Sequence, residues 1–194
     1  LLLTIIYTHA PATLAGDDDA MNEQFEALAE RYIDESTALS PVSATALGDH
    51  RFDHGLDQIS EEAREHGRDF LKGFLADVEQ IDRLLLSRDN QVDHALLRHE
   101  LQKQLWRLDR LEEWAWNPVV YTQLAGGAIY GLTARDFAPA RERLAAVTAR
   151  LEQFPRLYEQ IRQTLVPARV PRVHAETAAK QNDGVLNIID NAVR

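Results

Sequence analysis

The chain has 194 residues, 45% of them hydrophobic, which is enough to bury a sizeable core in one domain or in part of a larger one. Its 31 acidic and 21 basic residues give a net charge of −10, so nucleic acids and anionic membrane surfaces are disfavoured as partners. The absence of cysteine excludes disulfides, thiol catalysis and thiolate zinc sites.

Residues 1–19 are interpreted as the remnant of a secretory signal followed by a spacer. Residues 1–7 are apolar and small residues follow up to Ala15, as in the hydrophobic region and cleavage site of a signal. No basic region precedes them, so we expect the sequence to begin inside the signal of an exported protein, periplasmic or extracellular. The alternative is a frayed, apolar terminus. The stretch is shorter than the roughly 20 residues that span a membrane, and residues 16–19 are expected to be a solvated spacer.

After this spacer, apolar residues recur at steps of three, four or seven, which predicts long amphipathic helices. The first helix has an apolar stripe that starts at Met21, and it ends at Ser40-Pro41 because a residue before proline disfavours helical geometry. The second begins at Ser60, whose hydroxyl can cap free backbone amides, and continues to Leu85.

The third helix is expected to begin at Asp89 or Asn90 and to end at Asn117, where the rings of Trp114 and Trp116 can seal its end.

The fourth helix starts near Asp136 or Pro139 and contains Pro155, where we expect a kink because proline removes an amide donor. Residues 166–171 predict a rigid connector, and residues 173–193 predict the start of a fifth helix.

Between the third and fourth helices lies an apolar segment near residues 114–134, which has no charged side chain up to residue 133. Gly126, Gly127 and Gly131 disfavour a long regular helix, at about 1 kcal/mol for each internal glycine. We therefore expect an irregular conformation that something else must cover.

These patterns predict an all-α fold, an antiparallel helical bundle of about five long helices. The apolar periodicity continues to Arg194 without a glycine or proline stop after Ile189. We expect a helical domain over residues 20–194 that is truncated at its C-terminus. Its apolar segment would pack on the C-terminal portion of the same polypeptide or on a second copy of the chain.

The densest group of polar side chains is found in residues 48–55, Gly-Asp-His-Arg-Phe-Asp-His-Gly. His50, Asp53 and His54 carry nitrogen and oxygen atoms that suit zinc or a similar metal. The alternative is a turn in which aspartates cap backbone amides and Arg51 pairs with an acid. These four residues are candidates for binding a ligand, and no metal is assigned to them.

His99-Glu100 begins like the zinc motif H-E-x-x-H, but Lys103 stands where the second histidine is needed, and His94 lies on another face of the helix. Both histidines are expected to be exposed. The sequence has no G-x-S-x-G elbow and no phosphate-binding loop. We assign no catalytic, metal-binding or cofactor-binding residue in this chain.

Aromatic side chains near the apolar segment suggest a ligand-binding cleft. Trp116, Asn117, Tyr121 and Tyr130 are candidates for lining it. The alternative is packing in the core or in an interface, which is the more common role of such rings.

Three pieces of the sequence together resemble a bacterial family, the "domain of unknown function 885" family. They are Ser-Pro-Val-Ser-Ala-Thr-Ala-Leu-Gly-Asp-His-Arg-Phe-Asp (40–53), Trp-Asn-Pro-Val-Val-Tyr (116–121), and Ala-Arg-Asp-Phe-Ala-Pro (134–139) with the following helix that contains Leu151 and Pro155. The similarity covers residues 20–194 and corresponds to the N-terminal part of the family.

Members of this family are larger, mostly helical and often exported, and they resemble thermolysin-like zinc metallopeptidases. In those enzymes two histidines of an H-E-x-x-H helix bind zinc and the adjacent glutamate activates water. That motif lies in the C-terminal portion of the family and has no counterpart here. The resemblance implies the N-terminal helical region of an exported zinc-dependent peptidase-like protein, without the catalytic motif, that walls the cleft for a peptide substrate. The alternative is a stand-alone helical binding or scaffold module that self-associates.

Overall fold

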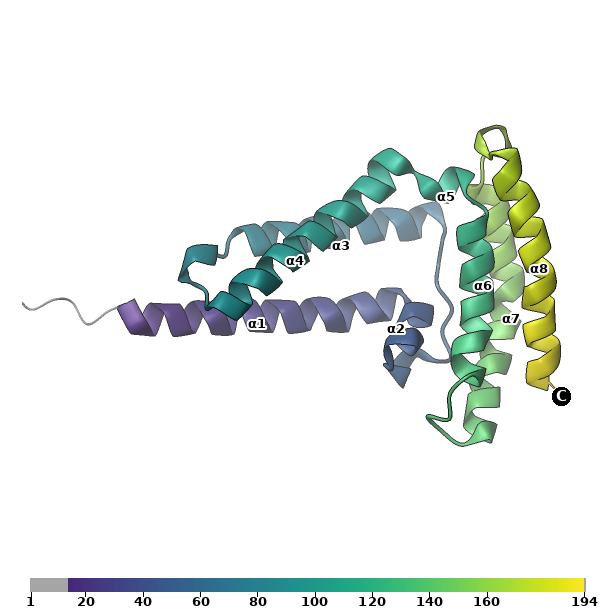
Figure 1. Cartoon of the computed structure of the whole chain (residues 1–194), viewed down its shortest axis with the longest axis horizontal. Helices are drawn as coiled ribbons and strands as arrows, with labels where there is room; N and C mark the ends of the chain where they lie inside the picture. The colour runs from purple at the N-terminus through teal and green to yellow at the C-terminus, as the bar shows by residue number, and fades with distance from the viewer. Residues whose placement is uncertain (1–13, 194) are drawn as a thin grey trace, which may run out of the picture.

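The computed structural model describes residues 14–193, with side chains described for residues 19–188 and 190. This part of the chain contains helices and no strand, so the all-α prediction is confirmed. Helices α1, α3 and α4 form an elongated arm, and α6, α7 and α8 form a bundle that runs across one end of it (Figure 1). The helices are α1 (Leu14–Leu39), α2 (Pro41–Leu47), α3 (Glu61–Glu79), α4 (Arg88–Trp106), α5 (Glu113–Trp116), α6 (Val119–Thr133), α7 (Ala140–Thr164) and α8 (Arg172–Val193).

The first helix starts earlier than predicted. Because α1 begins at Leu14, residues 16–19 are helical and do not form the expected spacer. The part of the expected signal remnant in residues 1–13 lies outside the described residues. At its other end α1 stops at Leu39 as predicted, and Pro41 occupies the first turn of α2, where its missing amide costs no helical hydrogen bond.

The arm has a hydrophobic core of its own. Ser60 caps α3 as predicted by accepting a hydrogen bond from the amide of Ala63 at 3.2 Å. The helix ends at Glu79, earlier than predicted, and Ser87 caps α4 in place of the expected Asp89 or Asn90. The buried side chains of this core are Phe25, Leu28, Leu71, Phe74, Val78, Ile81, Leu86 and Leu101.

His94 also belongs to the core of the arm, so the prediction that it is exposed is wrong. Its side chain is 6% exposed, its ring lies 5.8 Å from the ring of Phe25, and its Nε2 lies 3.0 Å from the carbonyl oxygen of Val78. Nearby apolar side chains from α1 and α3 enclose this face of α4. His99, on another face, is exposed as predicted.

A tight corner joins the arm to the bundle. A π-helical segment (Arg107–Leu111) follows α4, and Glu112 then adopts a left-handed backbone conformation with φ 48°. The Nε1 atoms of Trp114 and Trp116 donate to carbonyl oxygens of the π-helical segment at 3.0 and 2.9 Å. The two indole rings therefore cover the end of this helix, but the break at Glu112 contradicts the prediction of one helix that continues to Asn117.

Residues 119–133 of the apolar segment form the regular helix α6, which contradicts the irregular conformation expected for this part of residues 114–134. Gly126 of α6 faces Val185 of α8, and Gly127 faces Val42 of α2; a Cβ atom at either glycine would lie 3.5 Å from its neighbour. The absence of side chains lets the neighbouring helices approach closely. Tertiary packing thereby offsets the low helix propensity of glycine.

The chain itself covers most of this segment. Tyr121, Ala125, Ile129 and Leu132 are at most 6% exposed, because α2, α7 and α8 surround α6. The expectation that absent polypeptide or a second copy covers this face is therefore wrong for the buried side of α6. Tyr130, on the opposite side of the helix, is exposed.

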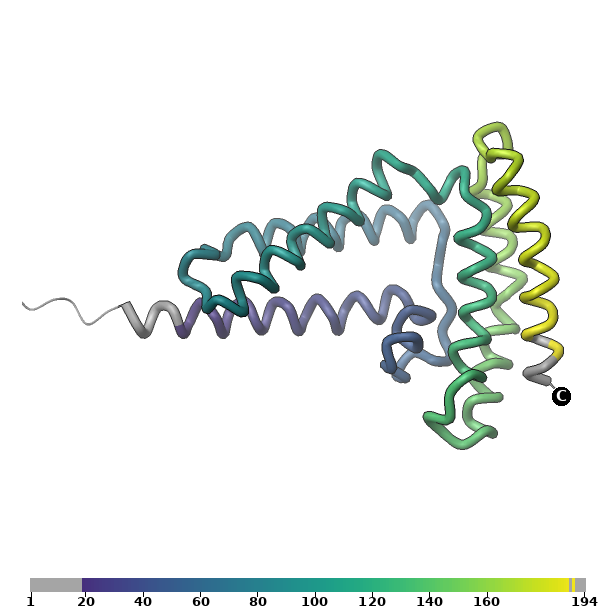
Figure 2. Tube along the Cα trace, in the orientation of Figure 1, coloured from purple at the N-terminus to yellow at the C-terminus, as the bar shows by residue number. Residues whose placement is uncertain are grey.

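The segment that links α2 to α3 runs along the bundle (Figure 2). Arginines of α7 hold this linker in place. Arg150, fully buried, donates from Nε to the carbonyl oxygen of Gly55 at 2.9 Å and from Nη1 to that of Ala128 at 2.8 Å. Arg156 donates from Nη2 to the carbonyl oxygen of Leu56 at 3.1 Å. The linker is thus fixed to the bundle through its backbone.

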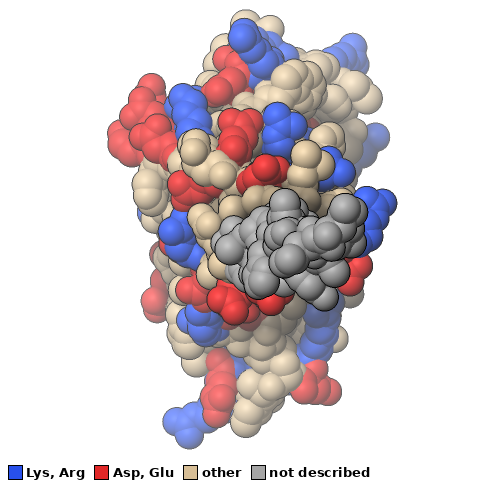
Figure 3. Space-filling model, turned by 90° about the vertical axis from the view of Figure 1, so that its left-hand side faces the viewer, with Lys and Arg blue, Asp and Glu red and all other residues tan. Residues whose placement is uncertain are grey.

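The bounds of the remaining long helices agree with the prediction. α7 begins after Pro139 and continues on both sides of Pro155, and a 3₁₀ turn (Pro167–Arg169) in the predicted connector leads into α8. Of the helices in the described part of the chain, none combines the length and apolarity needed to cross a membrane. Figure 3 looks toward the free end of the arm and shows acidic and basic side chains intermingled over the described surface in that view.

Candidate functional site

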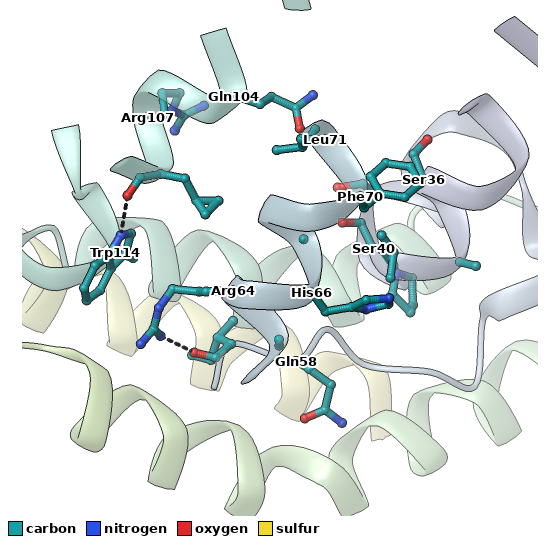
Figure 4. A pocket seen from close by; sticks show the side chains of 18 of the residues that line it. Ser36, Ser40, Gln58, Arg64, His66, Phe70, Leu71, Gln104, Arg107 and Trp114 are labelled. Atoms are coloured by element: carbon teal, nitrogen blue, oxygen red, sulfur yellow. Dashed lines mark hydrogen bonds between the residues drawn. The ribbon is translucent and has the colours of Figure 1, made fainter. Parts of the chain in front are cut away.

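A cavity of about 980 Å³ lies in the corner between the arm and the bundle. The C-terminal half of α1 and the start of α2 line one side, α3 and the end of α4 line another, and α6 begins at the inner end (Figure 4). Its volume lies within the range of sites that bind small ligands. The lining combines aromatic rings with hydroxyl, amide and charged groups.

Arg64, in the first turn of α3, lines the inner end of the cavity (Figure 4). Its Nη1 donates to the carbonyl oxygen of Ile59 at 2.8 Å and to the hydroxyl of Thr164 at 3.2 Å. The guanidinium carbon lies 4.3 Å from the ring centroid of Trp114, a favourable cation–π arrangement. Together these contacts fix the plane of the guanidinium group.

Tyr121, a candidate for lining a cleft, lies in the first turn of α6 and lines the same cavity. Its hydroxyl donates to the carbonyl oxygen of Trp114 at 2.6 Å. Burial raises the pKa of Tyr121 to about 12, and the nearby positive charge of Arg64 opposes this rise. The phenol therefore stays protonated at neutral pH and holds the start of α6 against α5.

Two acidic residues of the lining have basic partners. Glu113 accepts hydrogen bonds from Arg107 at 2.6 Å and from the side-chain amide of Asn117 at 2.7 Å. The bond from Arg107 lowers the pKa of Glu113. Glu100 pairs with Lys103, and this hydrogen bond lowers the pKa of Glu100. Both carboxyl groups are therefore ionised and neutralised by a neighbour at neutral pH.

A hydrogen bond bridges the two sides of the arm beside the cavity. Nε2 of Gln104 in α4 donates to the hydroxyl oxygen of Tyr32 in α1 at 3.1 Å. Burial raises the pKa of Tyr32, so this phenol also remains neutral and can accept the bond.

The ligand candidates of residues 48–55 do not line this cavity. His50 stacks on Phe137 with a centroid distance of 3.6 Å, and its Nδ1 lies 3.0 Å from Oδ2 of Asp53. The other carboxylate oxygen of Asp53 accepts a hydrogen bond from the hydroxyl of Thr45 at 2.6 Å. Asp53 is therefore used in holding the turn to α2.

Arg51 and His54 also take up the positions of turn residues. Arg51 pairs with Asp49 at 2.7 Å and with Asp34 of α1, and Asp49 also caps the backbone amide of Arg51. The side chain of His54 is exposed. Among the described side chains, no group of three or more histidines and carboxylates is placed to hold a metal ion.

The other aromatic candidates are divided between two places. Trp116 packs on His174 of α8 at a centroid distance of 5.3 Å, and Asn117 caps the amide of Val119 at the start of α6. Tyr130 borders a shallow apolar groove between α6 and α8, away from the cavity. Of these candidates only Tyr121 lines the cavity, and Asn117 supports its wall through Glu113.

Sequence reasoning did not identify Arg64, Gln104 or Arg107 as lining residues. A charged helix face that is exposed to solvent and one that lines a cavity have the same residue pattern. Which of the two roles the face has depends on the distant segment of the chain that lies opposite the helix. No pattern in the sequence pairs Arg64 with Trp114.

Residues 41–194 match the family described as "Bacterial protein of unknown function (DUF885)". The chain belongs to the DUF885 family. The resemblance identified in the sequence is thereby confirmed. A DUF885 assignment gives no activity, because the description of the family states none.

A solved structure from Shewanella oneidensis, provisionally described as a lipoprotein of unknown function, has the same fold as this DUF885 chain, with a TM-score of 0.79 at 29% sequence identity. The similarity covers 84% of this chain and 29% of that protein, so the chain spans less than a third of the length of this relative. A comparison with curated proteins gives no match.

Proposed function

We propose that this chain is the N-terminal helical region of an exported, zinc-dependent peptidase-like protein, and that the cavity forms one wall of its substrate cleft. The cavity between the arm and the bundle carries this proposal. Its volume of about 980 Å³ and its mixed lining suit part of a peptide. Its position at the junction of two units with separate cores is typical of ligand sites.

The described residues of this chain do not fit a zinc site. Lys103 stands where a zinc motif starting at His99 needs its second histidine, and Asp53 is already bonded to Thr45 and His50. We therefore place the zinc ligands and the water-activating glutamate in the remainder of a larger protein, as the resemblance to thermolysin-like enzymes implies. No chemical step is assigned to residues of this chain.

Two observations support the exported location. Residues 1–7 have the composition of the hydrophobic region of a secretory signal. The similar protein from Shewanella oneidensis is described as a lipoprotein, a class of protein that is attached to membranes after export.

The test is a pair of identical substitutions on α3 in the intact protein. Gly67 lines the cavity and Gly73 does not, and a Cβ at either position has no atom within 4 Å. We expect Gly67→Trp to fill the cavity and to raise KM for a peptide substrate about tenfold or more, a loss of about 1.4 kcal/mol in binding, with zinc content unchanged. Gly73→Trp is the matched control and should leave both unchanged.

Two results would contradict the proposal. One is an intact protein that loads zinc and hydrolyses no peptide. The other is peptide hydrolysis by these 194 residues alone, because they lack the catalytic motif.

The closed packing of α6 favours a second function, a helical binding or scaffold module. Because α2, α7 and α8 cover the apolar segment, the chain has the packing of a unit that folds by itself. This alternative predicts a monodisperse species with a single cooperative unfolding transition, measured by sedimentation and calorimetry. It also predicts that Gly67→Trp has no effect on any hydrolytic activity.

A further inference from the structure

The cavity is lined by two arginines whose partners differ. Arg107 is paired with Glu113, whereas Arg64 forms no ion pair with a described carboxylate. Only Nη1 of Arg64 is used in hydrogen bonds within the described residues. Its Nε and Nη2 atoms therefore keep the N–H donors of one edge of the guanidinium group available.

We propose that Arg64 anchors a carboxylate group of a peptide ligand in this cavity, through the Nε and Nη2 edge of its guanidinium. This inference rests on the proposed function, because it names the chemical group that the same cleft recognises. Two parallel N–H groups match the two oxygens of a carboxylate, which is the usual bidentate geometry of arginine.

The surroundings of Arg64 hold this edge ready. The hydrogen bonds of Nη1 to Ile59 and Thr164 fix one side of the group, and the indole ring of Trp114 covers a face. A fixed guanidinium loses less conformational entropy on binding than a free one. Pre-orientation of this kind is what a recognition site requires and what a solvated surface arginine lacks.

The charges around the cavity favour a singly charged ligand. Glu113 and Glu100 are neutralised by Arg107 and Lys103, so they repel a carboxylate only weakly. Glu62 also lines the cavity, and a hydrogen bond from Ser60 lowers its pKa, so it is ionised. With this charge nearby and a net charge of −10 on the chain, a phosphate with close to two charges is disfavoured relative to a carboxylate.

The residue that bears the carboxylate is expected to be apolar. Trp114 stacks on Arg64, the hydroxyl of Tyr121 bonds to the Trp114 carbonyl, and the indole N–H of Trp114 bonds to the carbonyl of Leu108. These three side chains line the cavity with Arg64. They offer an apolar surface to the ligand side chain next to the anchored group.

Titration calorimetry with three acetylated peptides tests the inference on the 194-residue chain. The probes are acetyl-Ala-Ala-Phe with a free carboxylate, the same peptide as its C-terminal amide, and acetyl-Ala-Glu-Phe as its amide. We expect the free acid to bind about tenfold or more tightly than the neutral amide, because a hydrogen bond to a charged group is lost. If the glutamate peptide binds like the free acid, Arg64 accepts any peptide carboxylate; if it binds like the neutral amide, Arg64 accepts the C-terminal carboxylate.

Variants of Arg64 locate the effect. Arg64→Gln should reduce the affinity for the free acid to that for the amide and leave the affinity for the amide unchanged. Arg141→Gln, on an exposed residue of α7 outside the cavity, should change neither. Arg64→Lys keeps the positive charge but lacks the two parallel N–H donors of the guanidinium, so it should retain only part of the preference for the free acid over the amide. This variant also serves if Arg64→Gln fails to fold.

Three results would overturn the inference. One is that the unaltered chain binds the free acid and the amide with equal affinity, and another is that Arg64→Gln lowers the affinities for the free acid and the amide equally. The third result is that the chain binds none of the three peptides. Equal binding that is abolished by Gly67→Trp would refute the carboxylate anchor and leave the peptide cleft standing. Binding that depends on the carboxylate in an intact protein that hydrolyses no peptide would refute only the proposed function.

Discussion

The Nη2 atom of Arg150, in the middle of α7, lies 2.6 Å from the hydroxyl oxygen of Thr45 in α2. The same guanidinium donates to three backbone carbonyl oxygens, those of Pro41, Gly55 and Ala128. One buried cation therefore ties α2, the linker and α6 to α7, and the nearby carboxylates of Asp53 and Asp57 oppose the cost of burying its charge.

We expect Arg150→Met to lower the free energy of unfolding by about 3–5 kcal/mol, because it leaves several buried acceptors without a donor. Urea unfolding measures this loss. Arg162→Met, at an exposed position of the same helix, is the control and should leave the stability essentially unchanged. A loss below about 1 kcal/mol for Arg150→Met would show that water replaces the guanidinium.

The close approach at Gly126 predicts opposite effects for a small and a large substitution. A Cβ at this position would lie at an ordinary contact distance of 3.5 Å from Val185, so Gly126→Ala should stabilise the chain by about 0.5–1 kcal/mol through helix propensity. Gly126→Leu should destabilise it by about 1–3 kcal/mol by forcing α8 away. Thermal unfolding of the two variants checks both signs, and equal effects would contradict the packing described for α6 and α8.

Tyr121 should make stability depend on pH in the alkaline range. Because burial raises its pKa from 10.0 to about 12, the unfolded chain loses this proton more readily than the folded chain as the pH rises. The stabilisation is complete below pH 10 and is lost as the pH approaches 12, by up to about 2–3 kcal/mol.

Tyr121→Phe removes this dependence and also the hydrogen bond to the carbonyl of Trp114. The variant should therefore be less stable than the unaltered chain at pH 9, and the difference should shrink at pH 11.5. Urea unfolding at both values is the measurement. A difference that stays constant would mean that the phenol is as accessible as in the unfolded chain.

Zinc should not bind saturably to this chain. Asp53 is bonded to Thr45 and faces His50, and Asp49 is paired with Arg51, so these side chains do not offer the three or four free ligands that zinc takes. Calorimetry with zinc chloride should show no stoichiometric binding, and His50→Ala should change nothing. Binding that disappears in His50→Ala would restore the metal interpretation of residues 48–55.

Local signals in the sequence predicted several helix ends. Ser60 caps α3, and proline at position 41 marks the boundary between α1 and α2, because both effects act within one turn of the backbone. α2 itself was not predicted, since seven residues are too few to establish an apolar period. Its role depends on contacts with the distant helix α6.

Long-range packing accounts for the errors. The glycines of α6 favour an irregular segment by propensity alone, and only the facing Val42 and Val185 show why a helix is stable there. Arg150 falls on the apolar stripe of α7 between Val147 and Phe154, so its spacing contained a signal that it is buried. The cavity could not be predicted, because its walls come from helices that are far apart in the sequence.

Val185 of α8 completes the core around α6, although it lies much later in the chain. A ribosome that has released α6 and α7 but not α8 therefore presents part of the apolar face of α6 to water. The arm can form earlier, because its core and the apolar side chains packed against it include no residue beyond Leu105. Nascent chains of intermediate length, between α7 and α8, are thus the stage at which aggregation and chaperone binding are most favoured.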